Sequence, residues 1–150
     1  MKRFVLFSLS LMLLSCGGEG EEGGPVGSHY QGQDCGRCHD FSGGTVFTQL
    51  HAPSSERYAA AYHTVKLIFK NGKTYTAPIG RGTGNFRIPK GNLQDSFTVV
   101  VLDKNGKEVN RSLDYLHTPD RFACNTCHTQ NGKNGAPGRI VNYNYYGGNK

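Results

Sequence analysis

The sequence predicts a mainly β protein: a small antiparallel β-sandwich of about six strands, with loop segments before and after it. Short segments rich in β-branched and aromatic residues recur between residues 44 and 114. Two Asn-Gly pairs, Asn71-Gly72 and Asn105-Gly106, are typical of tight two-residue hairpin turns. Only residues 55–61 have a helical pattern, and that segment is short. These features favour antiparallel sheets over a helical or mixed fold.

The expected strands follow from the alternation of apolar and polar residues. The clearest is 62–70, where alternate residues from His63 to Phe69 fall on one face. Residues 96–102 are apolar on both faces, which suits a central strand. The complete set of expected strands is 45–50, 62–70, 73–79, 85–89, 96–102 and 107–113. Because an even number of up-and-down strands returns the chain to its starting end, the segments flanking the sandwich should meet.

The turn Gly84-Asn85-Phe86 and the two Asn-Gly hairpins resemble those of transthyretin-like and carboxypeptidase-regulatory-like domains. The resemblance covers only about half of the chain that follows the leader described below. It implies a sandwich fold, and it carries no information about function.

Two copies of one five-residue pattern flank the expected sandwich: Cys35-Gly36-Arg37-Cys38-His39 and Cys124-Asn125-Thr126-Cys127-His128. Two thiols at this spacing can form thioethers to the vinyl groups of one haem, and the adjoining imidazole can then reach the iron. The pattern resembles the attachment sites of c-type cytochromes. The resemblance implies two haem c groups, bound through Cys35, Cys38, Cys124 and Cys127, with His39 and His128 as iron ligands.

Two other kinds of site also use C-x-x-C pairs. The pairs could together hold one zinc ion, or each could form a redox disulfide of the thioredoxin type. A zinc site does not need a histidine directly after both pairs. A thioredoxin motif should follow a strand of a βαβ unit, which this sequence lacks. We therefore favour haem.

Residues 1–15 have the pattern of a secretory signal. Lys2 and Arg3 precede an apolar run at 4–14 that is too short to span a bilayer as a permanent helix. The stretch Leu13-Leu14-Ser15-Cys16 resembles the bacterial lipobox, which implies that Cys16 is lipidated and begins the exported chain. An ordinary signal peptide followed by a stray thiol is the alternative. Residues 16–28, rich in Gly and Glu, are expected to form a flexible tether, and residues 29–150 the dihaem domain.

Cysteine and methionine counts support the haem interpretation. The chain has five cysteines, and assigning four to haem and one to lipid leaves no free thiol and no disulfide. Both methionines, Met1 and Met12, lie in the leader, so the exported chain has no methionine ligand for iron. We therefore expect histidine as the sixth ligand, and reduction potentials below those of His/Met cytochromes.

Four histidines remain as candidates for the sixth position: His29, His51, His63 and His117. His29 and His117 lie six and seven residues before the two motifs, so we predict this pair, without assigning either to a particular haem. His51 and His63 should lie at the far end of the sandwich, where His63 shares an apolar face and is expected to be buried. A ligand set that includes one of these two is the alternative.

The formal net charge is +6, with no Lys/Arg cluster and no nucleic-acid motif, so no nucleic-acid partner is expected. Five lysines are expected on a solvated sheet face and its turns, or alternatively in a docking patch for an acidic partner: Lys66, Lys70, Lys73, Lys104 and Lys107. Arg139 is expected either to pair with a haem propionate or to lie in a solvated loop. Tyr143, Tyr145 and Tyr146 could stack on a haem edge or pack on the sheet.

Resemblance to small multihaem cytochromes implies a lipid-anchored, exported electron carrier. With histidine on both sides of each iron, no position is open to a substrate, so electron transfer is expected rather than catalysis. Its partners would be other cytochromes or redox proteins. It would lie at the periplasmic or cell-surface face of a bacterial membrane, with the outer membrane favoured. The alternatives are a dihaem peroxidase or reductase with one open iron, and a subunit of a cytochrome filament or surface complex.

Overall fold

The computed structural model describes residues 30–80 and 82–145. The expected signal sequence, the lipobox cysteine Cys16, the tether and His29 lie outside the described residues. In the described part of the chain, none of the helices has the length and apolar character needed to cross a membrane.

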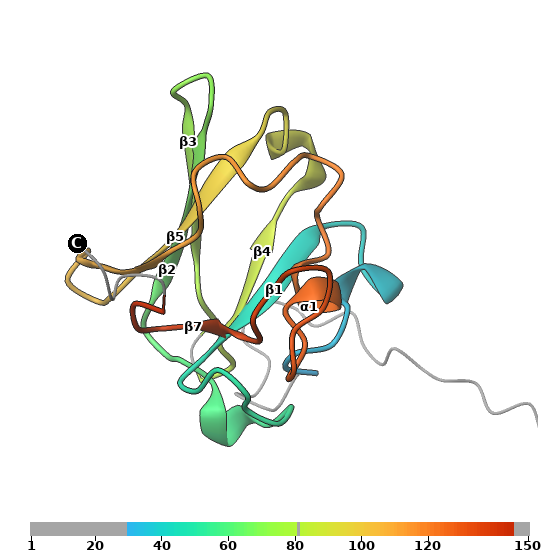
Figure 1. The fold of residues 1–150 in the computed structure, drawn as a ribbon, viewed down its shortest axis with the longest axis vertical. Coiled ribbons are helices and arrows are strands. Elements are labelled where there is room, and N and C mark those ends of the chain that lie inside the picture. The colour runs from blue at the N-terminus through green and yellow to red at the C-terminus, as the bar shows by residue number, and fades with distance from the viewer. Residues whose placement is uncertain (1–29, 81, 146–150) are drawn as a thin grey trace, which may run out of the picture.

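Seven strands form two sheets, which confirms the predicted β-sandwich (Figure 1). In spatial order, the four-stranded sheet contains β3 (Thr74–Pro78), β2 (Thr64–Phe69), β5 (Phe97–Leu102) and β6 (Glu108–Arg111). The three-stranded sheet contains β4 (Asn85–Ile88), β1 (Ser42–Phe47) and β7 (Ile140–Val141). Neighbouring strands are antiparallel except for β1 and β7, which are parallel.

All six expected strands are present with shifted ends, and both Asn-Gly turns occur where predicted. Gly72 (φ 84°) lies in the turn between β2 and β3, and Gly106 (φ 78°) lies in the turn between β5 and β6. β1 begins at Ser42 instead of residue 45. The expected helical segment contains a single 3₁₀ turn, η2 (Glu56–Tyr58). β7 was not expected from the sequence, because two residues are too short for a periodic pattern.

The core lies between the two sheets. Val65, Leu67 and Phe69 of β2 are buried and alternate with half-buried residues, as the period of two predicts. They pack in one cluster with Phe86 and Ile88 of β4. Every residue of β1 is buried, including Gly43 and Gly44. β1 has this pattern because the core covers one of its faces and the loop segments described below cover the other.

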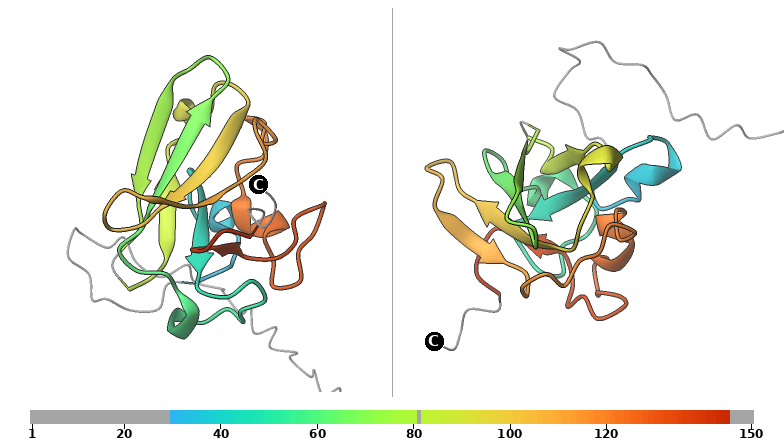
Figure 2. Two further views of the ribbon diagram at one scale, coloured as in Figure 1. Left: turned by 60° about the vertical axis from the view of Figure 1, so that its left-hand side comes forward. Right: turned by 90° about the horizontal axis from the view of Figure 1, so that it is seen from above.

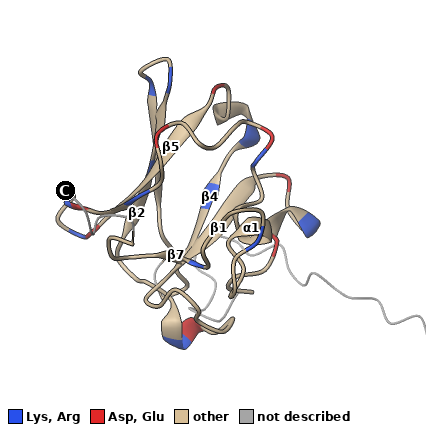
Figure 3. Ribbon diagram, in the orientation of Figure 1, with Lys and Arg blue, Asp and Glu red and all other residues tan. Residues whose placement is uncertain are grey.

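Charged residues are spread over the turns and edges instead of forming one patch (Figure 3). Lys70 and Lys73 flank the β2–β3 turn, Lys104 and Lys107 lie in the β5–β6 turn, and all four are exposed. Lys66 is half-buried on β2. The predicted position of the lysines on turns and a sheet face is therefore confirmed.

Candidate cofactor site

Both C-x-x-C-H motifs lie against β1. A Cβ at Gly43 would lie 3.3 Å from Cys35 Sγ, and a Cβ at Gly44 would lie 2.8 Å from Cys124 Cβ. Because neighbouring residues of a strand face opposite sides, the two motifs contact opposite faces of β1. The consecutive glycines are what allows this close approach. Six strands lie between the motifs, and the chain returns to its starting point as their even number predicts.

The residues just before the second motif pair with the same edge of β1 as β7 does. They contact the start of β1, and β7 contacts its end. Ala123 pairs with Gly43 in a parallel bridge, and Gly43 N donates to Phe122 O at 3.3 Å. The Ser42 hydroxyl donates to the same carbonyl. Figure 2 shows the orange and red segment that contains α1 and β7 lying along β1. The loop after the second motif therefore runs parallel to this strand.

Asn125, one of the two spacer residues of the second motif, connects this motif to β1 and to the segment before the first motif. It is 4% exposed. Its Oδ1 accepts from Thr45 N at 3.1 Å, and its Nδ2 donates to Thr45 Oγ1 at 3.1 Å and to Gln33 O at 2.8 Å. Sequence reasoning missed this residue because the pattern leaves the two spacer positions unspecified.

Each motif folds into one helical turn, which brings its histidine back toward its first cysteine. The second motif forms α1 (Cys124–Cys127), and His128 N donates to Cys124 O at 2.9 Å. The first motif forms η1 (Cys35–Arg37), and His39 N donates to Cys35 O at 3.0 Å. This local fold follows from the short C-x-x-C-H spacing, which a single turn spans.

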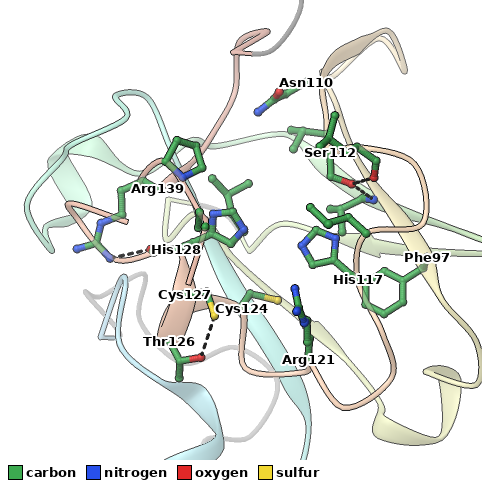
Figure 4. A pocket seen from close by; sticks show the side chains of 18 of the residues that line it. Phe97, Asn110, Ser112, His117, Arg121, Cys124, Thr126, Cys127, His128 and Arg139 are labelled. Carbon is green, nitrogen blue, oxygen red and sulfur yellow. Dashed lines mark hydrogen bonds between the residues drawn. The ribbon is translucent and has the colours of Figure 1, made fainter. Parts of the chain in front are cut away.

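A cavity of about 650 Å³ separates the second motif from the four-stranded sheet. Its size is within the usual range for small-molecule and cofactor sites. Its apolar wall is formed by Phe97, Val99, Val101, Leu116 and Ile140. Cys124, Cys127, His128 and His117 bring reactive side chains to the same cavity, with Arg121 beside His117 (Figure 4).

His117 and His128 face each other across this cavity, with ring centroids 6.3 Å apart and ring planes 27° apart. Because a metal lies about 2 Å from a ligating imidazole nitrogen, an iron held between two imidazoles places the ring centroids roughly 6 Å apart. The observed centroid separation has this value. The two rings form a stacked pair, so binding an iron would need their free nitrogens turned toward the space between them. His117 is held on the opposite wall by backbone hydrogen bonds to Phe97 of 2.8 and 3.2 Å, and its ring stacks on the Phe97 ring.

The hydrogen bonds of His128 leave one ring nitrogen for a metal. Its Nδ1 lies 3.0 Å from Gly138 O. Because a carbonyl oxygen only accepts hydrogen bonds, Nδ1 carries the proton and Nε2 keeps its lone pair. A backbone carbonyl on the second nitrogen is the usual partner of a metal-binding histidine. Nδ1 of His117, in contrast, is buried and has no hydrogen-bond partner among the described residues.

Both imidazoles favour the neutral form. Burial lowers the pKa of His117 to about 4, and nearby His128 and Arg121 contribute to the shift. Burial also lowers the pKa of His128, while its hydrogen bond to Gly138 opposes this shift. Metal binding requires neutral imidazole, so the two rings have the required protonation state at pH 7.

Three of the motif cysteines, Cys35, Cys124 and Cys127, carry free thiols. Burial raises the pKa of Cys124 to about 12, and proximity to Cys35 adds to the shift. Cys38 is disulfide-bonded, which differs from the expectation that the chain has no disulfide. A sulfur in a disulfide cannot form a thioether, so haem attachment at the first motif requires Cys38 in its reduced form.

The zinc alternative needs a larger set of protein ligands than these motifs bring together. Among residues 30–80 and 82–145, no three His, Cys, Asp or Glu side chains form a group that could hold a metal ion. A structural zinc site takes four protein ligands. A haem iron takes only its axial ligands from the protein. The pair His117 and His128 corresponds in number to the axial ligands of one haem iron.

The remaining described histidines lie outside this cavity wall. His39 is exposed and stacks on Phe41 with ring centroids 4.8 Å apart. His51 follows the end of β1, as predicted, but the loop after the second motif also reaches that end, and His51 Nδ1 lies 2.8 Å from Gln130 O. His63 is only half-buried, so the expectation of a buried residue is wrong, and its Nδ1 lies 2.6 Å from Ala61 O.

The expectation that Arg139 lies in a solvated loop is wrong. The side chain is 5% exposed, so it does not lie in a solvated loop. Its guanidinium donates to protein oxygen atoms, which leaves little capacity for a propionate. Tyr143 and Tyr145 are exposed. Tyr145 lines the cavity, whereas Tyr146 lies outside the described residues.

Comparison of the chain with protein-family models, with curated proteins and with solved structures finds no match.

Proposed function

We propose that the protein is an electron carrier with two covalently bound c-type haems. The observation that carries the proposal is the pair of neutral imidazoles, His117 and His128, whose rings face each other at 6.3 Å across a cavity that also contains Cys124 and Cys127. These four residues would hold the second haem, two through thioethers and two at the iron. The haem would supply the one-electron chemistry of iron.

The residues around the cavity fit a haem. The thiols are free, the wall facing them is largely apolar, and two of the lining residues, Leu113 and Leu116, are exposed to solvent. A buried imidazole whose Nδ1 has no partner, as in His117, is costly for a side chain that only fills space. Ligation would give this ring a role.

The first haem would be held by Cys35, Cys38 and His39, and His29 remains the proposed sixth ligand. The contact of Cys35 and Cys124 with consecutive residues of one strand supports a short path between the haems. With His117 as its sixth ligand, the second iron would have no open position. This favours electron transfer over catalysis. The lipid anchor at Cys16, export to a bacterial membrane surface and cytochrome partners remain part of the proposal and rest on the sequence. Because Cys35, Cys124 and Cys127 are free, a disulfide at Cys38 and lipidation of Cys16 exclude each other within one chain, so the proposal requires Cys38 in its reduced form.

The direct test is expression of the full chain in a host competent in cytochrome maturation, followed by optical spectroscopy and mass spectrometry. We expect two haems per chain and low-spin spectra in both oxidation states. A colourless protein that binds zinc would refute the proposal. A high-spin ferric signal in the wild type would favour the peroxidase or reductase alternative, and elution as a large assembly would favour the filament or surface-complex alternative.

Substitution of His117 tests whether this residue is the sixth ligand of the second haem. His117→Ala should convert one of the two haems to a high-spin form and leave the other unchanged. His63→Ala is the matched control, because His63 directly precedes β2 and lies outside the cavity lining, and it should keep both haems low-spin. If His117→Ala leaves both haems low-spin, His117 is not the sixth ligand.

A further inference from the structure

Arg139 lies in a site built from three separate segments of the chain. Its Nε donates to Ala52 O at 3.1 Å, and its Nη2 donates to Ser54 Oγ at 2.9 Å. Its Nη1 donates to Gly32 O at 3.2 Å and to His128 O at 3.3 Å. The guanidinium carbon also lies 4.7 Å from the centre of the Phe47 ring. One side chain therefore joins the segment before the first motif, the loop after β1 and the end of the second motif.

The segment before the first motif is shaped around this guanidinium. A Cβ at Gly32 would lie 2.5 Å from Arg139 Nη1, and Gly32 has a positive φ of 72°. Only glycine combines this backbone conformation with such a close approach. The contact is therefore part of the fold and not an incidental position of a long side chain.

The charge of Arg139 is not neutralised by any carboxylate in residues 30–80 and 82–145. The ion pairs in this part of the chain involve Lys90 and Arg111 instead. All four acceptors of Arg139 are neutral oxygen atoms. Because arginine keeps its proton even when buried, a full positive charge stands beside His128.

Two consecutive residues hold His128. Gly138 O accepts from its Nδ1, and Arg139 donates to its backbone carbonyl. A positive charge in a partly buried site favours the state of a neighbouring group that carries less positive charge, which for a haem iron is the ferrous state.

We propose that Arg139 positions His128 and raises the reduction potential of the second haem relative to the first. This inference rests on the proposed function. It makes Arg139 a positioning residue that acts through His128 and through its charge, without contact with a propionate.

Ser54 offers a test that leaves Arg139 in place. Ser54→Asp puts a carboxylate next to Nη2, and Ser54→Asn is the matched neutral control of nearly the same shape. Ser54 is exposed, so both variants should fold. At a fixed solution potential, we expect the ratio of reduced to oxidised second haem to be roughly three- to tenfold lower in Ser54→Asp than in Ser54→Asn, as for one unit charge across a partly buried site. The first haem should change less, and both should stay low-spin.

Thermal unfolding of the same samples provides a readout that does not depend on electron transfer. Ser54→Asp should unfold at a higher temperature than Ser54→Asn, because it pairs a buried lone cation. Equal potentials in the two variants would overturn the inference, and so would a shift confined to the first haem. A wild type without haem would overturn the proposed function as well, so the two failures are distinguishable.

Substitution of Arg139 itself separates charge from geometry. Arg139→Lys keeps the charge but loses the planar fork, so it should retain the higher potential of the second haem and unfold at a lower temperature. Arg139→Gln loses both the charge and the planar fork, so it should lower both the potential of the second haem and the unfolding temperature. If Arg139→Gln binds two haems with wild-type potentials, the inference is wrong. If it does not fold, the pair of Ser54 variants decides.

Discussion

A Cβ added to Gly44 would lie 2.8 Å from Cys124 Cβ and 2.9 Å from the tip of the Phe86 ring. Gly44 thus lies between the core and the first cysteine of the second motif. The strand has no side chain at this position, and the motif occupies the space.

Gly44→Ala should therefore destabilise the fold and reduce haem attachment at the second motif. Overpacking of this kind costs about 1–3 kcal/mol. Gly44 is not among the glycines with a positive φ, so the expected cost comes from the close contacts of the new Cβ and not from backbone strain. Urea unfolding measures the first effect and the haem count the second. Gly91→Ala is the matched control, since a Cβ there meets nothing within 4 Å. Equal stability of the two variants would contradict the close approach.

Asn125 should matter more to the site than a spacer residue normally does. Asn125→Ala removes three hydrogen bonds and leaves Thr45 N and Gln33 O without their partner. Leaving buried polar groups unpaired costs about 1–3 kcal/mol. The expected result is a lower unfolding midpoint with haem still attached at the first motif. Asn131→Ala, at an exposed asparagine in the following loop, should leave the midpoint unchanged.

The strands of the sandwich could be predicted because their signals are local. Alternation in β2 and the glycines at residues 72 and 106 depend only on neighbouring residues, and the structure follows them. β7 could not be predicted in the same way. Its two residues are a strand only because the loop after the second motif runs parallel to Val46 and Phe47, which are distant in sequence.

The environment of Arg139 could not be predicted from the sequence, because it depends on contacts between residues that are distant along the chain. Arg139 looked like a loop residue because Pro137 and Gly138 precede it, yet its acceptors lie up to 107 positions away along the chain. His117, by contrast, was selected for its position shortly before the second motif. The structure places it opposite that motif's own histidine, a pairing that the sequence left open.

The state of Cys38 should depend on whether the protein is loaded with haem. In the structure, Cys38 is disulfide-bonded, and Cys35, Cys124 and Cys127 carry free thiols. In haem-free chain whose Cys16 is not lipidated, we therefore expect alkylation of Cys38 only after reduction, and alkylation of the other three without it, most slowly at half-buried Cys124, whose pKa is raised. In haem-loaded chain, none of the four should react under either condition, because thioethers are not reduced by thiols. Peptide mass spectrometry distinguishes these patterns. Alkylation of Cys38 in the loaded protein would show that the first motif lacks its haem.

Burial of His117 should make the stability of the haem-free chain depend on pH. Its pKa falls from 6.5 to about 4 on folding, so the unfolded chain binds more protons between these values. Stability should therefore be complete above pH 6.5 and decline as the pH falls toward 4, by about 2–3 kcal/mol. Urea titrations of a variant with all four motif cysteines replaced by serine measure this slope.

His117→Gln in that haem-free background should reduce the slope without abolishing it, because burial also lowers the pKa of His128 and acts in the same direction. His51→Gln, which changes an exposed imidazole outside the cavity, is the matched control in the same background and is compared with the same parent. If His117→Gln and the parent lose stability equally between pH 6.5 and 4, His117 is not buried against His128 in solution. The facing pair of imidazoles on which haem ligation depends would then not be preformed.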